Sequence, residues 1–117
     1  MHAAVFSTKQ YEREAKRLLT ETEISAMETS IAADPEAHPI IIGTGGIRKA
    51  RWGRQGKGKS SGVRVIYYYW NADNEVYMLY VYAKKEQADL DPASRKAAKS
   101  FVEELKHAKE QHNQDRS

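Results

Sequence analysis

Cationic side chains are concentrated between Gly43 and Arg64. This span holds seven Lys and Arg residues and all seven glycines of the chain, and no Asp or Glu occurs between Glu36 and Asp73. Attraction to phosphates sums over many cations and needs little sequence specificity. The span therefore predicts a basic ribbon that binds a polyanion such as nucleic acid.

Arg64 has the most unusual position among these cations, because apolar residues surround it at the start of a predicted strand. A guanidinium presents a fixed fork of donors that matches the oxygens of a phosphate. We therefore predict that Arg64 grips a phosphate group. The alternative is a salt bridge at the edge of the sheet.

A predicted hairpin brings further charge to Arg64. The strands on either side of a turn at residues 71–74 should pair antiparallel, so the end of the second strand lies near Arg64. Cations there can hold a scissile phosphodiester while a carboxylate takes the proton of the attacking 2′-hydroxyl. The alternative is a basic binding surface on which Glu86 is only an ion-pair partner. The predicted catalytic cluster combines both strand ends with the neighbouring basic strand: Lys49, Arg51, Arg64, Lys84, Lys85 and Glu86.

The segment between Gly53 and Ser60 matches the GxxxxGK(S/T) pattern of a nucleotide-binding P-loop. That motif requires a helix directly after it, whose N-terminal amides hold the phosphates. Here the following residues, 62–67, are typical of a strand. We interpret the match as a coincidence and do not expect nucleotide hydrolysis.

Metal and thiol chemistry have little support in the sequence. The chain has no cysteine, which excludes disulfides, thiolate ligands and a cysteine nucleophile. Among its four histidines, His107 and His112 are five residues apart, which does not place them on one helical face. We predict neither a metal site nor a cofactor.

The first part of the chain predicts a strand at residues 2–6 followed by two short helices. Capping boxes at Ser7–Gln10 and Thr20–Glu23 should open these helices. Pro35 should end the second helix, because proline disfavours helical geometry in the residue before it.

Three strands should follow, at residues 47–52, 63–70 and 76–83, because these runs are amphipathic or rich in β-branched and aromatic residues. A last helix should start at Pro92 with Asp91 as its N-cap. Its polar end, residues 109–117, is predicted to fray.

These elements predict one domain over residues 1–117 with an α+β fold, built from a strand, a helical hairpin, three strands of a small mainly antiparallel sheet and a C-terminal helix. The N-terminus shows no secretory signal, and no apolar run is long enough to cross a bilayer. We therefore expect a soluble cytoplasmic protein that does not bind membranes.

Several separated motifs resemble the RelE/HigB superfamily of toxin–antitoxin ribonucleases. They are GTGGIRK, GKGK, RVIYY and YAKKEQADL, which occur in this order between residues 42 and 90. The pattern is most similar to the HigB-like branch. The resemblance implies a microbial-RNase-like fold without a cofactor and ribosome-dependent cleavage of mRNA in the decoding site. It also implies a cognate antitoxin, typically a HigA-like helix-turn-helix protein, that masks the basic cleft.

The resemblance also implies roles for particular residues. Arg64 matches the arginine that grips the scissile phosphate, Lys49 and Arg51 match the basic strand, and Lys84, Lys85 and Glu86 match the cluster after the last strand. A second group is expected to contact RNA and the ribosome: Arg48, Arg54, Lys57 and Lys59.

The chain departs from its relatives at Asp91, where RelE has a catalytic tyrosine and another HigB branch has histidines. General acid–base catalysis then falls to Lys84, Lys85 and Glu86, with Glu86 predicted as the base, or the chemistry depends on phosphate stabilisation and positioning by the ribosome. Two alternatives stay open. One is a non-catalytic inhibitor of DNA gyrase on the same fold, like the ParE branch, and the other is a plain RNA-binding domain.

Overall fold

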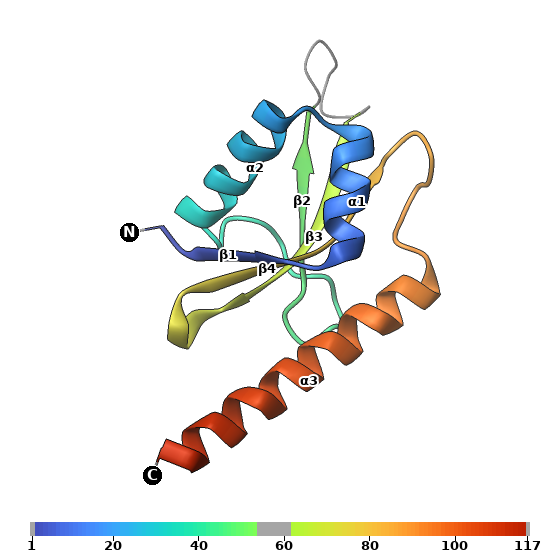
Figure 1. Ribbon diagram of the computed structural model, residues 1–117. Helices are drawn as coiled ribbons and strands as arrows, with labels where there is room; N and C mark the ends of the chain where they lie inside the picture. Colours follow the sequence, from blue (N-terminus) through green and yellow to red (C-terminus); the bar gives the residue numbers. More distant parts are fainter. Residues whose placement is uncertain (1, 54–61, 117) are drawn as a thin grey trace.

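The computed structural model describes residues 2–53 and 62–116 and has an α+β fold (Figure 1). Its strands form one four-stranded sheet in the order β1-β4-β3-β2, in which β1 pairs parallel with β4 and the other pairings are antiparallel. The predicted fold class is confirmed. In chain order the elements are β1 (Ala4–Ser7), α1 (Lys9–Leu18), α2 (Glu21–Ala33), β2 (Arg48–Trp52), β3 (Val63–Trp70), the short helix η2 (Asn71–Asp73), β4 (Glu75–Ala83) and α3 (Pro92–Arg116).

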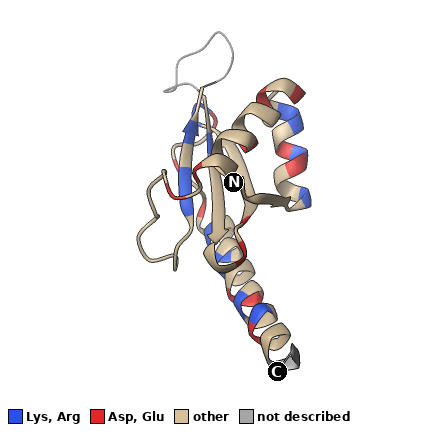
Figure 2. Ribbon diagram, turned by 90° about the vertical axis from the view of Figure 1, so that its left-hand side faces the viewer, with Lys and Arg blue, Asp and Glu red and all other residues tan. Residues whose placement is uncertain are grey.

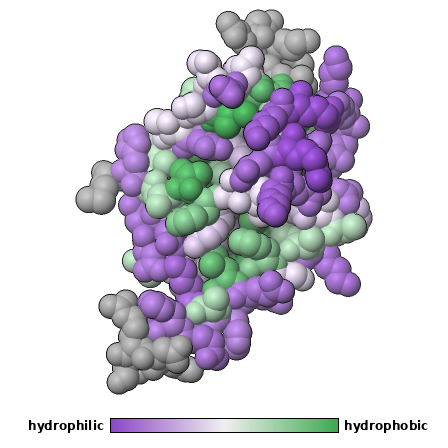
Figure 3. Space-filling view, viewed as in Figure 1, coloured by the Kyte–Doolittle hydropathy of each residue, from purple (hydrophilic) through white to green (hydrophobic). Residues whose placement is uncertain are grey.

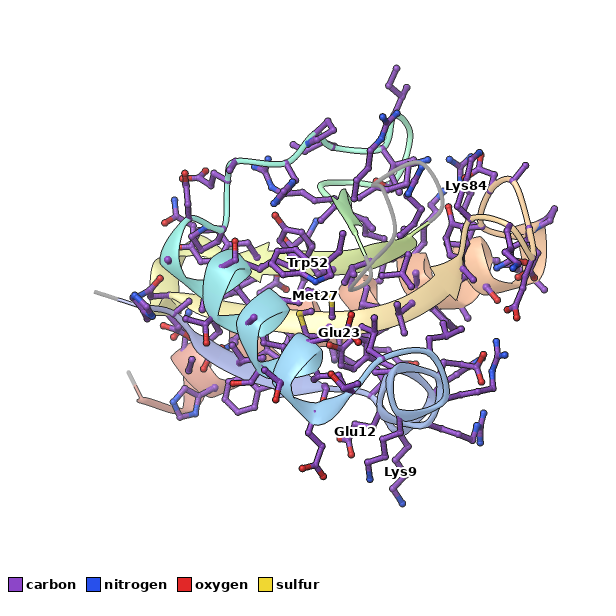
Figure 4. All side chains as sticks on the ribbon, turned by 90° about the horizontal axis from the view of Figure 1, so that it is seen from above. Lys9, Glu12, Glu23, Met27, Trp52 and Lys84 are labelled. Carbon is purple, nitrogen blue, oxygen red and sulfur yellow. The ribbon has the colours of Figure 1, made fainter. Side chains whose placement is uncertain are left out.

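Different helices cover the two faces of the sheet. Side chains of α1 and α2 pack against one set of strand residues, and side chains of α3 pack against the alternating set. Figure 4 shows Met27 of α2 and Trp52 of β2 in the layer between helix and sheet. The outer surface of α1 is hydrophilic (Figure 3), because Tyr11 and Ala15 turn their side chains into the core.

The first helix begins one residue later than its predicted capping box. Thr8 is the N-cap, and its hydroxyl accepts a hydrogen bond from the Tyr11 N–H at 3.1 Å. The sheet selects Thr8, since its N–H donates to the Met78 carbonyl at 3.1 Å and its hydroxyl donates to the Leu79 carbonyl at 2.9 Å. The predicted box at Ser7–Gln10 is therefore wrong.

The second helix begins and ends as predicted. At its N-terminus Thr20 and Glu23 exchange reciprocal side-chain to backbone hydrogen bonds of 2.9 and 3.1 Å. This confirms the capping box. The helix ends at Ala33, and Asp34, the residue before Pro35, is its C-cap.

The hairpin of β3 and β4 has the predicted course. A register shift between Ile66 and Tyr67 leaves Leu79 of β4 as an additional residue, because Ile66 pairs with Tyr80 and Tyr67 pairs with Met78. Leu79 and Tyr80 thus both contribute to the apolar cluster on the α3 side.

The C-terminal helix starts as predicted but extends further than expected. Asp91 caps it, with its Oδ2 accepting a hydrogen bond from the Ser94 N–H at 3.0 Å. The helix continues through Arg116. Lys109 joins this helix to the hairpin, because its ammonium lies 2.5 Å from Asp73 and 2.6 Å from Glu75. None of the helices in the two described stretches is apolar over a length that could cross a membrane.

Candidate functional site

Three polar side chains form a row across the sheet. Arg51 of β2 pairs with Arg64 of β3, and Arg64 pairs with Tyr82 of β4. Residues directly opposite on neighbouring strands point to the same face. Lys49 lies two residues before Arg51 and so shares this face, which is also the α3 side of the sheet.

Strand alternation fixes this arrangement. Ala50, Trp52, Val63 and Val65 lie between the cations in sequence and pack into the core under α1 and α2. A shift of one residue in either strand would bury the cations in that core. The same apolar pattern that builds the fold therefore presents the basic row on the opposite face. Figure 2 shows the Lys and Arg positions along β2 in blue.

Arg64 is buried, with 6% of its surface exposed, and its Nη1 donates to the Val63 carbonyl at 3.3 Å. Its cross-strand neighbour Arg51 is exposed. Like charges directly opposite each other destabilise a sheet, and burial removes part of the water that would screen them. A pair of this kind favours binding of an anion.

Asp89 provides a carboxylate at this row. Its Oδ1 lies 3.3 Å from the Nζ of Lys49. A hydrogen bond from the Leu90 N–H, at 2.8 Å, lowers the pKa of Asp89 most, and the hydrogen bond from Lys49 lowers it further. Asp89 belongs to the YAKKEQADL motif, but the sequence alone predicted no role for it.

The segment after β4 lies beside the start of β3, as the hairpin predicted. The Lys84 N–H donates to the Gly62 carbonyl at 3.0 Å, and the Lys84 Nζ donates to the Ala88 carbonyl at 3.2 Å. Figure 4 shows Lys84 at the far side of the sheet from Lys9 of α1. Lys85 is exposed in the same segment.

Glu86 also belongs to this segment, but its carboxylate meets α1. The guanidinium of Arg17 donates to its two oxygens at 2.7 and 3.1 Å. Glu86, Tyr82 and Asp91 line a cleft of about 260 Å³ between α1, β4 and the start of α3. Two carboxylates of this segment therefore lie near the basic row. Asp89 contacts Lys49, and Glu86 contacts Arg17 and lines the cleft.

Tyr82 completes the row and was not singled out from the sequence. It is 5% exposed, and its hydroxyl is the one buried side-chain polar atom without a hydrogen-bond partner in the part of the chain that the structure describes. Burial raises the pKa of Tyr82 most, the nearby Asp89 carboxylate raises it further, and Arg64 lowers it. The hydroxyl therefore lies near both Asp89 and Arg64. Its signal in the sequence was its place opposite Arg64 in the hairpin.

The second predicted group is not assembled in the same way. Arg48 lies on the other face, since it pairs with Tyr67, and its Nη1 donates to the carbonyls of His38 at 2.7 Å and Glu36 at 3.2 Å. The structure thus does not bring Arg48 to the basic row. Arg54, Lys57 and Lys59 lie outside the described residues.

The P-loop interpretation is excluded by the element that follows it. Val63–Trp70 is strand β3, so no helix N-terminus follows the GKGKS segment. The face that carries Lys49, Arg51 and Arg64 can instead bind one or two phosphates of a polynucleotide and place a carboxylate beside them.

Comparisons with known proteins agree with this fold. The family model for the RelE toxin of the RelE/RelB toxin–antitoxin system matches residues 3–115. The structure of the isolated Escherichia coli RelE toxin is 17% identical and covers 85% of this chain and 98% of its own, with a TM-score of 0.54. A double arginine mutant of E. coli RelE in the free state is also 17% identical, covering 75% of this chain and 90% of its own with a TM-score of 0.55.

Proposed function

Because the chain belongs to the RelE toxin family of toxin–antitoxin systems, we propose that it is a ribosome-dependent endoribonuclease that cleaves mRNA in the decoding site and inhibits translation. Within the superfamily we place it in the HigB-like branch, on the motifs between residues 42 and 90. The enzyme is proposed to work without a metal or another cofactor.

The observation that carries this proposal is the direct pairing of Arg51 with Arg64, with Lys49 on the same face. Like charges directly opposite each other on neighbouring strands repel. A phosphodiester relieves that repulsion, and the charge that develops on phosphorus-bound oxygens during cleavage strengthens the interaction. Preorganised donors of this type stabilise the transition state more than the ground state.

The proposed reaction is an attack of the 2′-hydroxyl on the adjacent phosphate. The 2′-oxygen forms a bond to phosphorus while its proton passes to a carboxylate of the site. The bond from phosphorus to the 5′-oxygen breaks, and the 5′-oxygen takes a proton from a lysine ammonium. The products are a 2′,3′-cyclic phosphate and a free 5′-hydroxyl.

We assign the proton acceptor to Asp89, because its carboxylate lies 3.3 Å from Lys49 on the face of the basic row. Glu86, the base predicted from the sequence, is the alternative, and its pairing with Arg17 places it at the neighbouring cleft. Lys84 and Lys85 are proposed as the source of the proton for the leaving oxygen. The neighbouring positions of these residues on the segment after β4 support both roles.

Two partners follow from the proposal. The ribosome presents the mRNA, and Arg54, Lys57 and Lys59 are proposed to follow the RNA backbone near the decoding site. A cognate antitoxin, proposed to be a HigA-like helix-turn-helix protein, is expected to neutralise the toxin by covering the basic face. We propose the cytoplasm as the site of action, because the substrate is translated there.

A translating extract with a reporter mRNA tests the proposal directly. The 5′ ends of the mRNA are mapped after addition of the protein, of Arg64→Ala and of Lys16→Ala. Lys16 is a matched control, because it is an exposed cation on α1, across the sheet from the basic row. We expect cleavage by the native protein and by Lys16→Ala, and a loss of about 100-fold or more in Arg64→Ala.

The same assay separates the alternatives. Intact mRNA in the extract, together with stalled growth of cells that express the protein, would contradict the ribonuclease and favour a gyrase inhibitor. Cleavage of ribosome-free RNA at the same rate would contradict the ribosome dependence. Ribosome binding without cleavage would leave a plain RNA-binding domain.

A further inference from the structure

The hydroxyl of Tyr82 is buried without a hydrogen-bond partner in the described part of the chain. Native proteins satisfy nearly all such groups, because a buried donor that has lost its water weakens the folded state. Tyr67 shows the usual arrangement, since its hydroxyl donates a hydrogen bond to the Pro35 carbonyl at 2.7 Å. The exception at Tyr82 lies in the basic row and needs an explanation.

The surroundings of this hydroxyl indicate a partner. Arg64 lies directly opposite Tyr82 in the sheet. The Asp89 carboxylate raises the pKa of Tyr82 through its charge and through a weak hydrogen bond, and the contact falls short of the geometry of a full hydrogen bond. In the observed arrangement the Oδ1 of Asp89 accepts hydrogen bonds from the Lys49 ammonium at 3.3 Å and from the Leu90 N–H at 2.8 Å.

The ion pair between Lys49 and Asp89 is weak enough for a bound phosphate to replace Asp89 as the partner of Lys49. The Asp89 side chain is 65% exposed and that of Lys49 is 34% exposed, and ion pairs in contact with water contribute little. A phosphate bound by Arg51 and Arg64 competes for the Lys49 ammonium on the same face. Once Lys49 turns to the phosphate, Asp89 loses its ion pair with Lys49.

We propose that Tyr82 is a positioning residue for Asp89: when substrate phosphate draws Lys49 away, the buried Tyr82 hydroxyl donates a hydrogen bond to the Asp89 carboxylate and holds it beside the reacting 2′-hydroxyl. This inference rests on the proposed ribonuclease function and on Asp89 as its base. A hydrogen bond from a shielded hydroxyl is stronger than one in water, so it can hold an exposed carboxylate.

Tyr82→Phe tests the proposal, because it removes only the hydroxyl. Three quantities are measured: the free energy of unfolding, the affinity for ribosomes programmed with mRNA, and the single-turnover cleavage rate at saturating toxin. We expect a stability equal to or above that of the native protein and an unchanged ribosome affinity. The cleavage rate should fall about tenfold, which is typical when a group that orients a catalytic residue is lost.

A second variant shows whether Tyr82 acts through Asp89. In an Asp89→Asn background, adding Tyr82→Phe should produce no further loss of rate. Tyr67→Phe is the matched control. It removes a hydroxyl with a hydrogen bond to Pro35, so it should lower stability and leave the cleavage rate unchanged.

The outcomes are distinct. If the native protein and Tyr82→Phe cleave mRNA equally fast, the role of Tyr82 is overturned and the ribonuclease function stands. A rate loss that adds fully to that of Asp89→Asn overturns the action through Asp89. A native protein that does not cleave mRNA on ribosomes overturns the proposed function, and the role of Tyr82 with it.

Discussion

Arg17 at the end of α1 and Glu86 after β4 form a two-pronged ion pair, with distances of 2.7 and 3.1 Å between their nitrogen and oxygen atoms. Arg17 also contacts Glu14 at 3.0 Å on its own helix. The pair connects elements 69 residues apart in sequence and anchors the segment that carries Lys84, Lys85 and Asp89. Because Glu86 is paired with Arg17 and Asp89 with Lys49, substitutions at these residues can distinguish the two candidate bases.

A comparison of Glu86→Gln, Arg17→Met and Asp89→Asn should identify the base. With Asp89 as the base, Asp89→Asn should reduce the cleavage rate about 100-fold or more. Glu86→Gln and Arg17→Met should resemble each other, with small losses, because both release the exposed ion pair between Arg17 and Glu86. Single-turnover cleavage on programmed ribosomes measures all three. A large loss in Glu86→Gln alone would return the role of base to Glu86.

Arg51→Ala should separate stability from activity. Removing one of two like charges that face each other across strands should raise the free energy of unfolding by about 0.5 kcal/mol. The same change should lower the cleavage rate, because the phosphate loses a donor. Urea denaturation and the cleavage assay measure the two effects. A variant that is both less stable and fully active would contradict the assignment of Arg51 to the phosphate site.

Arg64→Lys checks the need for a guanidinium. Lysine preserves the charge but replaces the planar fork with a single ammonium. We expect a rate between those of the native protein and Arg64→Ala, with ribosome affinity close to native. A rate equal to that of the native protein would show that Arg64 acts through its charge alone.

Much of the fold follows from local sequence signals. Residues 63–70 are a continuous run of β-branched and aromatic residues with one arginine, and β3 has these bounds. The capping box at Thr20 and the Asp91–Pro92 start of α3 depend on neighbouring residues only, so a single sequence reveals them. The antiparallel hairpin then places Lys84 near Arg64.

The features that the sequence did not reveal depend on contacts between distant segments. Ser7 and Thr8 are equally good caps, and only hydrogen bonds from Thr8 to β4 decide between them. The pairing of Lys49 with Asp89 joins residues 40 positions apart, and no local pattern specifies it. Only the three-dimensional structure shows that the Tyr82 hydroxyl is buried without a full hydrogen bond among the described residues.

The double change Lys57→Ala with Lys59→Ala tests the proposed contact with ribosomal RNA. Each cation that neutralises a phosphate adds about 0.7 to 0.9 to the slope of log affinity against log salt. The variant should bind ribosomes more weakly and with a smaller slope, while its unfolding transition stays unchanged. Binding measured across a salt series reveals the slope. An unfolded variant would show that the two lysines have a structural role instead.

Thr20→Ala should destabilise the protein by about 1 kcal/mol, because it removes the side-chain acceptor for the Glu23 N–H at the start of α2. Thr22→Ala is the control, since Thr22 is exposed inside the first turn of the same helix. Alanine is the better helix former there, so the control should be neutral or slightly stabilising. Equal effects of the two changes in thermal unfolding would contradict the capping role.

Glu75→Gln should reveal how α3 is held against the hairpin. The carboxylate accepts hydrogen bonds from the ammonium of Lys109 at 2.6 Å and from the Tyr77 hydroxyl at 2.7 Å, and both side chains of the ion pair are about four-fifths buried. The bond from Lys109 lowers the pKa of Glu75 below its ordinary value of 4.5, against the opposing effect of burial. Loss of such a charged hydrogen bond should cost about 2 kcal/mol at neutral pH.

The pH dependence of this loss provides its own control. Since the folded-state pKa of Glu75 lies below the unfolded value, its stabilisation is complete above pH 4.5 and disappears as the pH falls through the folded-state pKa. For Lys109, burial lowers the pKa but the bonds to Asp73 and Glu75 raise it above 10.5, so its contribution is complete below that pH. The difference in unfolding free energy between the native protein and Glu75→Gln should therefore be constant from about pH 6 to 9 and shrink in acid. Glu104→Gln, an exposed position on α3, is the matched control, and an equal, pH-independent loss in both variants would contradict the link between Lys109 and Glu75.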